Sequence, residues 1–195
     1  MDLIKTGIEG LDNILKGGLL PHRTYLVRGG PGSGKTTLGL QFLSSAKNSK
    51  NLFISLGESV EKIKNDAKKR GINLNNVKFL ELTPTSDYFH NDENYSIFNS
   101  EEIEKSPLIN KILNKIKTFK PDRIFLDSIT YFSYLSNDKF QYRKELLSVI
   151  KFAAEEKVTF LLTSESTKEN PDDDLQFVVD GVFNLTNQND ERYLY

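Results

Sequence analysis

The chain has no cysteine, no tryptophan and a single methionine among its 195 residues. The absence of cysteine excludes a disulfide framework and thiolate chemistry. The chain has nearly equal numbers of basic and acidic residues, 26 and 27. This balance gives no support to a strongly basic nucleic-acid-binding protein. No apolar run approaches the roughly 20 residues of a membrane-spanning helix, and the first residues do not resemble a signal peptide. We therefore expect a cytoplasmic protein with no membrane association.

What is present is typical of a soluble globular domain. Hydrophobic residues make up 37% of the chain and charged residues 27%, and the length is sufficient for one domain with a real core. The sequence contains no internal repeat and no obvious linker. We expect residues 1–195 to form one domain.

The most informative segment is 29–37, Gly-Gly-Pro-Gly-Ser-Gly-Lys-Thr-Thr, which fits the phosphate-binding pattern G-x-x-x-x-G-K-[ST]. Glycines allow the backbone to turn tightly, so that successive N–H groups point at phosphate oxygens. In this pattern Lys35 reaches the β- and γ-phosphates, and the Thr36 hydroxyl binds Mg²⁺. The predicted nucleotide-binding residues here are Gly30, Pro31, Gly32, Ser33, Gly34, Lys35, Thr36 and Thr37.

Strand-like and helix-like segments alternate along the chain, which favours an α/β fold with a central, mostly parallel sheet and helices on both faces. A first short helix ends at Gly17-Gly18, and the last two strands flank a turn like an antiparallel hairpin. The polar, acidic stretch 84–106 is expected to be a long loop, which is usually functional or mobile. The expected strands are 24–28, 52–56, 77–82, 123–127, 158–162, 182–186 and 192–195, and the longer helices 35–46, 60–70, 108–119 and 140–156.

Ligands of such sheets bind beyond the carboxyl ends of the strands, and several strands here end in polar residues. Asp127 ends an apolar strand, and we interpret it as the acidic residue that orders the Mg²⁺ shell, through water or through Thr36. The alternative is a strand-end Asp that caps the next segment. Thr36 and Asp127 are thus the predicted metal residues.

Hydrolysis also needs a group that orients the attacking water. Glu58 is our candidate, because it follows strand 52–56, which we expect to lie near the strand that precedes the phosphate loop. An acidic residue at the start of a helix is the alternative interpretation. At the end of strand 158–162, Ser164 or Glu165 could sense the γ-phosphate, and we assign Ser164 to the nucleotide-binding set. The predicted catalytic pair is Glu58 and Lys35.

The segment 6–12, Thr-Gly-Ile-Glu-Gly-Leu-Asp, followed by Gly17-Gly18-Leu19 and the phosphate loop, resembles the entry of the RecA/KaiC superfamily of P-loop ATPases. Leu-Gly-Glu-Ser at 56–59 before a charged helix, and Asp-Ser at 127–128, are more similar to archaeal KaiC-like ATPases than to RecA recombinases. The resemblance covers essentially the whole chain. It implies a RecA-like core, ATP and Mg²⁺ as ligands, and rings or filaments in which ATP sits between subunits. By position, it makes Glu58 the catalytic carboxylate.

Two departures from the family pattern bear on catalysis. Gly57 stands where the family often carries the first of two acidic residues, so that Glu58 is alone and slow hydrolysis is favoured. The family also usually continues beyond the final hairpin into a basic Lys/Arg-Gly segment that reaches the neighbouring subunit's γ-phosphate, and this sequence ends at Tyr195 without it. Either catalysis across subunits is weakened, or a segment beyond these residues supplies it.

The sequence therefore leads to a KaiC-like ATPase, a regulatory or switch protein that hydrolyses ATP. The alternative is a nucleotide-gated interaction protein, or a recombination and repair mediator, with little hydrolysis. In that case ATP binding would order the 84–106 loop or an assembly surface for a protein partner. DNA binding is disfavoured by the near-neutral charge but stays open, and the choice of ATP over GTP comes from the resemblance alone.

Overall fold

The computed structural model describes residues 2–82, 107–131, 139–165, 173–188 and 191–194. Within this part of the chain, seven strands form one sheet in the order β3-β2-β4-β5-β1-β6-β7. All neighbouring strands are parallel except the last pair, β6 and β7, which form an antiparallel hairpin. The strands are β1 (Thr24–Gly29), β2 (Asn51–Ser55), β3 (Val77–Glu81), β4 (Arg123–Asp127), β5 (Thr159–Ser164), β6 (Gly181–Gln188) and β7 (Glu191–Leu194).

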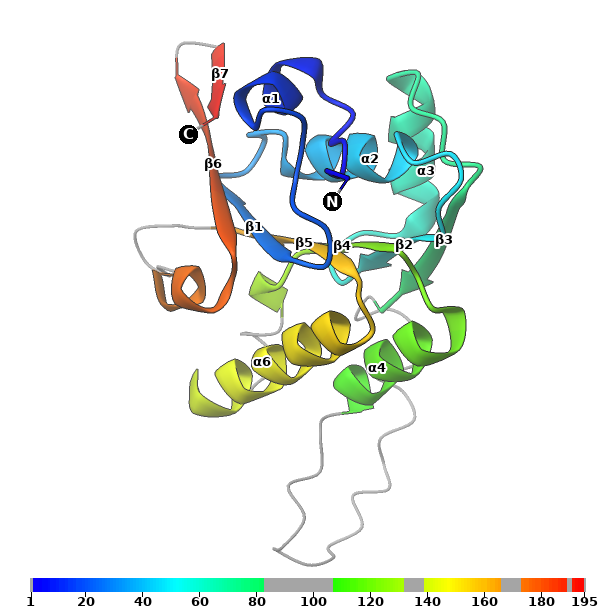
Figure 1. Ribbon diagram of the computed structural model, residues 1–195, viewed down its shortest axis with the longest axis vertical. Helices are drawn as coiled ribbons and strands as arrows, with labels where there is room; N and C mark the ends of the chain where they lie inside the picture. Colours follow the sequence, from blue (N-terminus) through cyan, green and yellow to red (C-terminus); the bar gives the residue numbers. More distant parts are fainter. Residues whose placement is uncertain (1, 83–106, 132–138, 166–172, 189–190, 195) are drawn as a thin grey trace, which may run out of the picture.

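Helices cover both faces of the sheet (Figure 1). The helices α1 (Glu9–Ile14), α2 (Lys35–Ser44) and α3 (Val60–Lys69) lie on one face, and α4 (Pro107–Phe119) and α6 (Lys139–Glu155) lie on the other. A 3-10 helix, η1 (Asp173–Val178), follows β5 and was not expected from the sequence. The predicted RecA-like α/β fold, with its mostly parallel sheet and C-terminal hairpin, is thus confirmed.

The strand order corrects one expectation about the sheet. We expected strand 52–56 to lie near the strand that precedes the phosphate loop, but β4 and β5 lie between β2 and β1. The neighbours of β1 are β5 and β6 instead. Because all the parallel strands end at the same edge, a residue that follows β2 still reaches the end of β4.

The core divides into two clusters because side chains alternate across each strand. Phe53, Phe125 and Leu161 face α2 and α3, and the rings of Phe53 and Phe125 meet edge to face at 5.0 Å. Their sequence neighbours Leu52 and Ile124 face α4 and α6 with the other apolar cluster. Both faces of the sheet are thus buried, as a parallel sheet requires.

The N-terminal segment is held in shape by hydrogen bonds between its own residues. The backbone N–H and the hydroxyl of Thr6 both donate to one Asp12 oxygen, at 2.8 and 2.9 Å. Ile4 and Leu19 exchange backbone hydrogen bonds of 2.7 and 2.8 Å. Gly18 lies so close to this pair that an added Cβ would be 2.3 Å from the Ile4 carbonyl oxygen, and its φ is +135°. The Thr-Gly and Gly-Gly pairs of this segment therefore fix the backbone conformation of the segment.

A buried arginine lies at the amino end of β4, opposite the end that carries Asp127. The Arg123 guanidinium donates to the carbonyls of Lys5 and Phe42 at 3.0 and 2.8 Å, and to the Ser45 hydroxyl at 3.1 Å. Burial lowers its pKa, while Asp12 and Asp122 act in the opposite direction. Arg123 therefore connects the N-terminal segment, α2 and β4.

The predicted loop at 84–106 lies outside the described residues. In the part of the chain that the structure does describe, no helix is long and apolar enough to cross a membrane.

Candidate functional site

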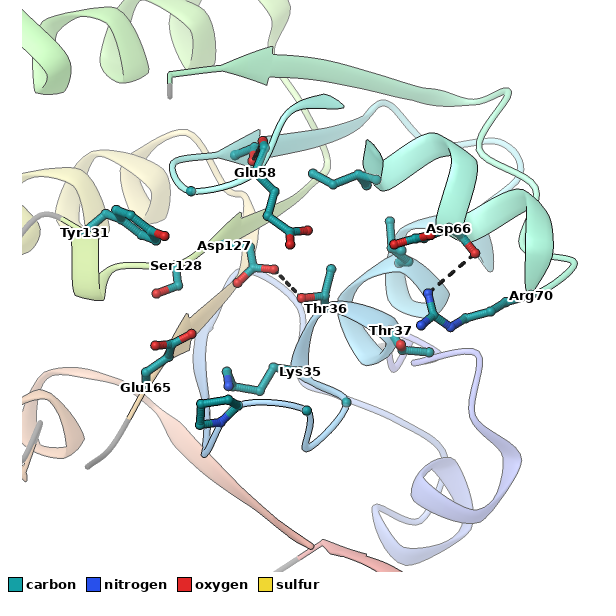
Figure 2. A pocket seen from close by; sticks show the side chains of 17 residues that line it. Lys35, Thr36, Thr37, Glu58, Asp66, Arg70, Asp127, Ser128, Tyr131 and Glu165 are labelled. Carbon is teal, nitrogen blue, oxygen red and sulfur yellow. Dashed lines mark hydrogen bonds between the residues drawn. The ribbon is translucent and has the colours of Figure 1, made fainter. Parts of the chain in front are cut away.

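The carboxyl ends of the parallel strands surround a cavity of about 600 Å³. Side chains at one end of it include Glu58, Asp127 and Tyr131, and those at the other end include Asp66 of α3 and Arg70, the residue that follows this helix (Figure 2). The loop between β1 and α2 lines one side of the cavity. The lining residues are Pro31, Gly32, Gly34, Lys35, Thr36, Thr37, Leu40, Ser55, Gly57, Glu58, Ile63, Asp66, Arg70, Asp127, Ser128, Tyr131 and Glu165.

The loop between β1 and α2 is held in shape by its glycines and its lysine. Gly32 and Gly34 have φ of +74° and +103°, conformations that favour glycine. The Lys35 ammonium donates to the carbonyl oxygens of Gly29 and Gly30, at 2.8 and 3.0 Å, so the side chain folds back under the loop. Helix α2 begins at Lys35, directly after the loop. Its first backbone N–H groups have no partner within the helix and are available to a ligand in the cavity.

Lys35 is 7% exposed, and its charge is the main electrostatic feature of the loop. Burial lowers its pKa, whereas the carboxylates of Glu165 and Asp127 act to raise it. The buried ammonium group favours an anionic ligand, whereas the two carboxylates repel a polyanion unless a cation accompanies it.

Asp127 is fixed by hydroxyl groups from two other elements. The Thr36 hydroxyl donates to Asp127 Oδ2 at 2.6 Å (Figure 2). The Thr163 hydroxyl of β5 donates to Asp127 Oδ1 at 2.5 Å. Each carboxylate oxygen therefore has a defined partner, and the predicted metal residues Thr36 and Asp127 are in direct contact.

Strand register explains which residues reach the site. Ser55 pairs with Asp127, and Leu126 with Leu162, so that Ser55, Asp127 and Thr163 form a polar row across β2, β4 and β5. Side chains alternate along a strand, so Thr163 and Glu165 share a side and Ser164 lies on the other. Accordingly Glu165 lines the cavity, whereas Ser164 is 1% exposed and does not line it. Of our two sensor candidates, the one next to the cavity is Glu165, not the assigned Ser164.

Glu58 lies at the same end of the cavity as Asp127 (Figure 2). Its carboxylate accepts a hydrogen bond from Lys62 Nζ at 2.6 Å, and this bond raises the pKa of Lys62. Its backbone carbonyl accepts a hydrogen bond from the Ser55 hydroxyl. Ser59 caps α3 by accepting from the backbone N–H of Lys62 at 3.4 Å. Glu58 is thus placed by the turn between β2 and α3.

Two of the predicted loop residues do not line the cavity. Gly30 contributes its carbonyl oxygen to Lys35 instead. Ser33 is buried behind the loop, where an added Cβ on Gly29 would lie 2.6 Å from its Oγ. The remaining predicted members, from Pro31 to Thr37, all line it.

Sequence reasoning missed three groups of the site: Thr163, Tyr131, and the pair Asp66 and Arg70 on α3 and directly after it. Thr163 carries a detectable signal, because a threonine at the end of a strand that neighbours Asp127 is placed to bond it. No sequence signal points to Tyr131, Asp66 or Arg70, which reach the cavity only through the packing of their elements.

The donor set fits a magnesium–polyphosphate ligand. The cavity has glycine backbone and a lysine at the loop, next to a hydroxyl and a carboxylate, which are the ligand types that Mg²⁺ prefers alongside phosphate oxygens and water. Among the described residues no cluster of three or more His, Cys, Asp or Glu side chains could form an all-protein metal cage. The site thus suits a metal that arrives with phosphates.

Comparison with known proteins gives a consistent result. The family model of the KaiC ATPase matches residues 4–194. The circadian clock oscillator protein KaiC of Nostoc sp. is 32% identical over 176 residues, which is 87% of this chain and 33% of that protein. The KaiC of Prochlorococcus marinus subsp. pastoris is 31% identical over 171 residues, 83% of this chain and 32% of its own length.

A second kind of relative is the DNA repair protein RadA of Aquifex aeolicus, 32% identical over 170 residues, which cover 84% of this chain and 33% of RadA. The chain thus spans about a third of the length of these curated relatives. The match to the family model covers nearly all 195 residues. The chain belongs to the KaiC family of RecA-type ATPases.

Proposed function

We propose that this protein binds and hydrolyses ATP with Mg²⁺ and acts as a regulatory or switch ATPase. The observation that carries the proposal is the 2.6 Å hydrogen bond between Thr36 and Asp127, directly beside the buried ammonium of Lys35. These are the three groups that P-loop nucleotide sites use for the metal and the terminal phosphates.

In this proposal each part of the cavity has one task. The backbone of residues 32–37 and the Lys35 ammonium bind the phosphates. Thr36 and Asp127 hold Mg²⁺, which when bound supplies positive charge next to the β- and γ-phosphates. Thr163 keeps Asp127 in its orientation. The ribose and base lie toward α3, beside Asp66 and Arg70, because the cavity extends to these two residues.

Glu58 orients the attacking water in the proposed reaction. The water oxygen bonds to the γ-phosphorus, the bond to the β-phosphate oxygen breaks, and a water proton leaves toward the Glu58 carboxylate. The ion pair with Lys62 competes for this carboxylate, which supports a slow reaction. We further propose that residues 1–195 act as one such domain, in the cytoplasm, within a homo-oligomeric ring or filament whose neighbouring subunit completes the site.

Two substitutions test the proposal against one matched control. Glu58→Gln should retain saturable binding of Mg·ATP and lose phosphate release. Lys35→Ala should lose both. Glu61→Gln changes another acidic residue in the first turn of α3 that does not line the cavity, and it should behave as wild type. Wild-type phosphate release by Glu58→Gln would remove Glu58 from the reaction, and unchanged release by Lys35→Ala would refute the proposed function.

A nucleotide-gated interaction protein with little hydrolysis is a second candidate, supported by the similarity to RadA and by the Glu58–Lys62 ion pair. It predicts that ATP changes assembly without turnover. Phosphate release measured beside light scattering, with and without Mg·ATP, separates the two: assembly with no release favours the second candidate. A salt-dependent shift of single-stranded DNA would extend it to a DNA-binding mediator.

A further inference from the structure

Gly57, the residue before Glu58, packs against the ring of Tyr131. A Cβ added to Gly57 would lie 2.2 Å from Tyr131 Cε2, 2.5 Å from Cζ and 2.7 Å from the phenolic oxygen. Atoms never approach so closely without moving, so Tyr131 occupies the volume that any side chain at residue 57 would need. Both residues line the cavity.

We propose that Tyr131 is a further residue of the hydrolytic end of the site, where its hydroxyl donates a hydrogen bond to the γ-phosphate or to the attacking water, and that Gly57 is the residue that leaves room for it. This inference deepens the proposed ATPase function and rests on it.

The topology brings the two residues together. Ser55 and Asp127 are register partners on β2 and β4, and Leu56 N donates to the Asp127 carbonyl at 2.8 Å. The chain then continues from these partners on both sides, to Gly57 after β2 and to Tyr131 after β4. The contact is therefore a consequence of parallel pairing at the edge of the sheet that carries the site.

The turn that carries Tyr131 is fixed by several hydrogen bonds. Its backbone N–H donates to the Ser128 carbonyl at 3.2 Å, and the N–H of Thr130 donates to the Ser128 hydroxyl at 3.2 Å. The N–H of Glu165 donates to the Thr130 hydroxyl at 2.9 Å, which ties the turn to the end of β5. The ring is thus held on a backbone that is anchored to two strands.

The direction of the side chain suits the proposed role. Figure 2 shows Tyr131 at the end of the cavity that also holds Glu58, Asp127 and Ser128. A carboxylate can only accept hydrogen bonds, whereas a phenol can donate one to a phosphate oxygen or to water. Tyr131 therefore brings a neutral donor to a place where Glu58, Asp127 and Glu165 already supply three carboxyl groups.

Tyr131→Phe is the direct test, because it removes the hydroxyl and keeps the ring. We expect phosphate release in a single turnover to slow by about 10-fold, the value of one hydrogen bond made in the transition state, while the dissociation constant of Mg·ATP changes by less than about 3-fold. The matched control is Tyr193→Phe on β7, whose side chain is 40% exposed and does not line the cavity, and it should match wild type. Equal rates for wild type and Tyr131→Phe would overturn the role of Tyr131 alone. No release by wild type would overturn the ATPase function together with it.

The pairing with Gly57 has its own test, with a measurement that needs no nucleotide. Gly57→Ala should lower the melting temperature when Tyr131 is present, and should lower it less in a Tyr131→Ala background, because the clash has gone. Gly57→Ala alone should also slow phosphate release about 10-fold by displacing the ring. Additive melting shifts together with a wild-type rate for Gly57→Ala would overturn the pairing.

Discussion

The substitution Asp127→Asn separates the structural role of this carboxylate from its role toward the metal. Asp127 accepts two charge-assisted hydrogen bonds, from Thr36 at 2.6 Å and from Thr163 at 2.5 Å. Bonds of this kind contribute about 1.5–3 kcal/mol each, and neutral ones about 1 kcal/mol. An asparagine keeps its oxygen toward one hydroxyl group and turns its NH₂ group toward the other. That second hydroxyl group can rotate and accept a hydrogen bond from the NH₂ group. The change therefore costs about 2 kcal/mol without nucleotide.

Thermal unfolding measures this cost. For a domain of this length, about 2 kcal/mol corresponds to a melting temperature about 4–8 °C lower. The sharper effect is on the metal: Mg²⁺ should strengthen ATP binding to the wild type, relative to EDTA, and should no longer strengthen it in Asp127→Asn. The comparison uses isothermal calorimetry of ATP in Mg²⁺ and in EDTA.

Asp122→Asn is the matched control at the other end of β4. Asp122 accepts one hydrogen bond, from the backbone N–H of Lys50 at 2.8 Å, and lies far from the cavity lining. Its substitution should cost about 1 kcal/mol or less and leave the Mg²⁺ effect unchanged. If Asp127→Asn retains the full strengthening of ATP binding by Mg²⁺, the assignment of Asp127 to the metal is wrong.

Two further predictions concern the loop and the N-terminal segment. Burial lowers the pKa of Lys35 below its ordinary 10.5, so between the lowered pKa and 10.5 the unfolded chain binds a proton that the folded chain does not. The wild type should therefore gain stability relative to Lys35→Met as the pH rises toward 10.5, and a constant difference in melting temperature over the alkaline range would contradict the burial argument. Gly18→Ala should lower the free energy of unfolding, measured with urea, by more than about 2 kcal/mol, because the new Cβ would clash with the Ile4 carbonyl. Gly10→Ala in α1, where there is open space for a Cβ, should raise it by about 0.5–1 kcal/mol. Equal effects of the two alanines would exclude the close contact at Gly18.

Much of the fold could be predicted because its signals are local. Apolar periodicity placed the strands and longer helices near their observed bounds, and the glycine-rich pattern placed the loop that Lys35 closes. The contact between Thr36 and Asp127 followed from the rule that parallel strands end at one edge.

What could not be predicted depends on contacts between distant segments. The position of β2, with two strands between it and β1, is decided by the packing of whole strands and helices, not by the sequence of β2. The sequence does not show which of Ser164 and Glu165 faces the cavity, because strand ends are poorly defined by pattern. The contact of Gly57 with Tyr131 joins residues that follow different strands.

The lysine that folds back onto Gly29 and Gly30 has a consequence for ligand binding. Because its ammonium group bridges two carbonyl oxygens of the same loop, the chain's own contacts hold the loop in one conformation, and less conformational entropy is left to be lost on binding. An incoming anion then exchanges one set of oxygens for another around a cation that stays in place. Binding of an anion then depends on how much more strongly the Lys35 ammonium group bonds the oxygens of the anion than the carbonyl oxygens of Gly29 and Gly30.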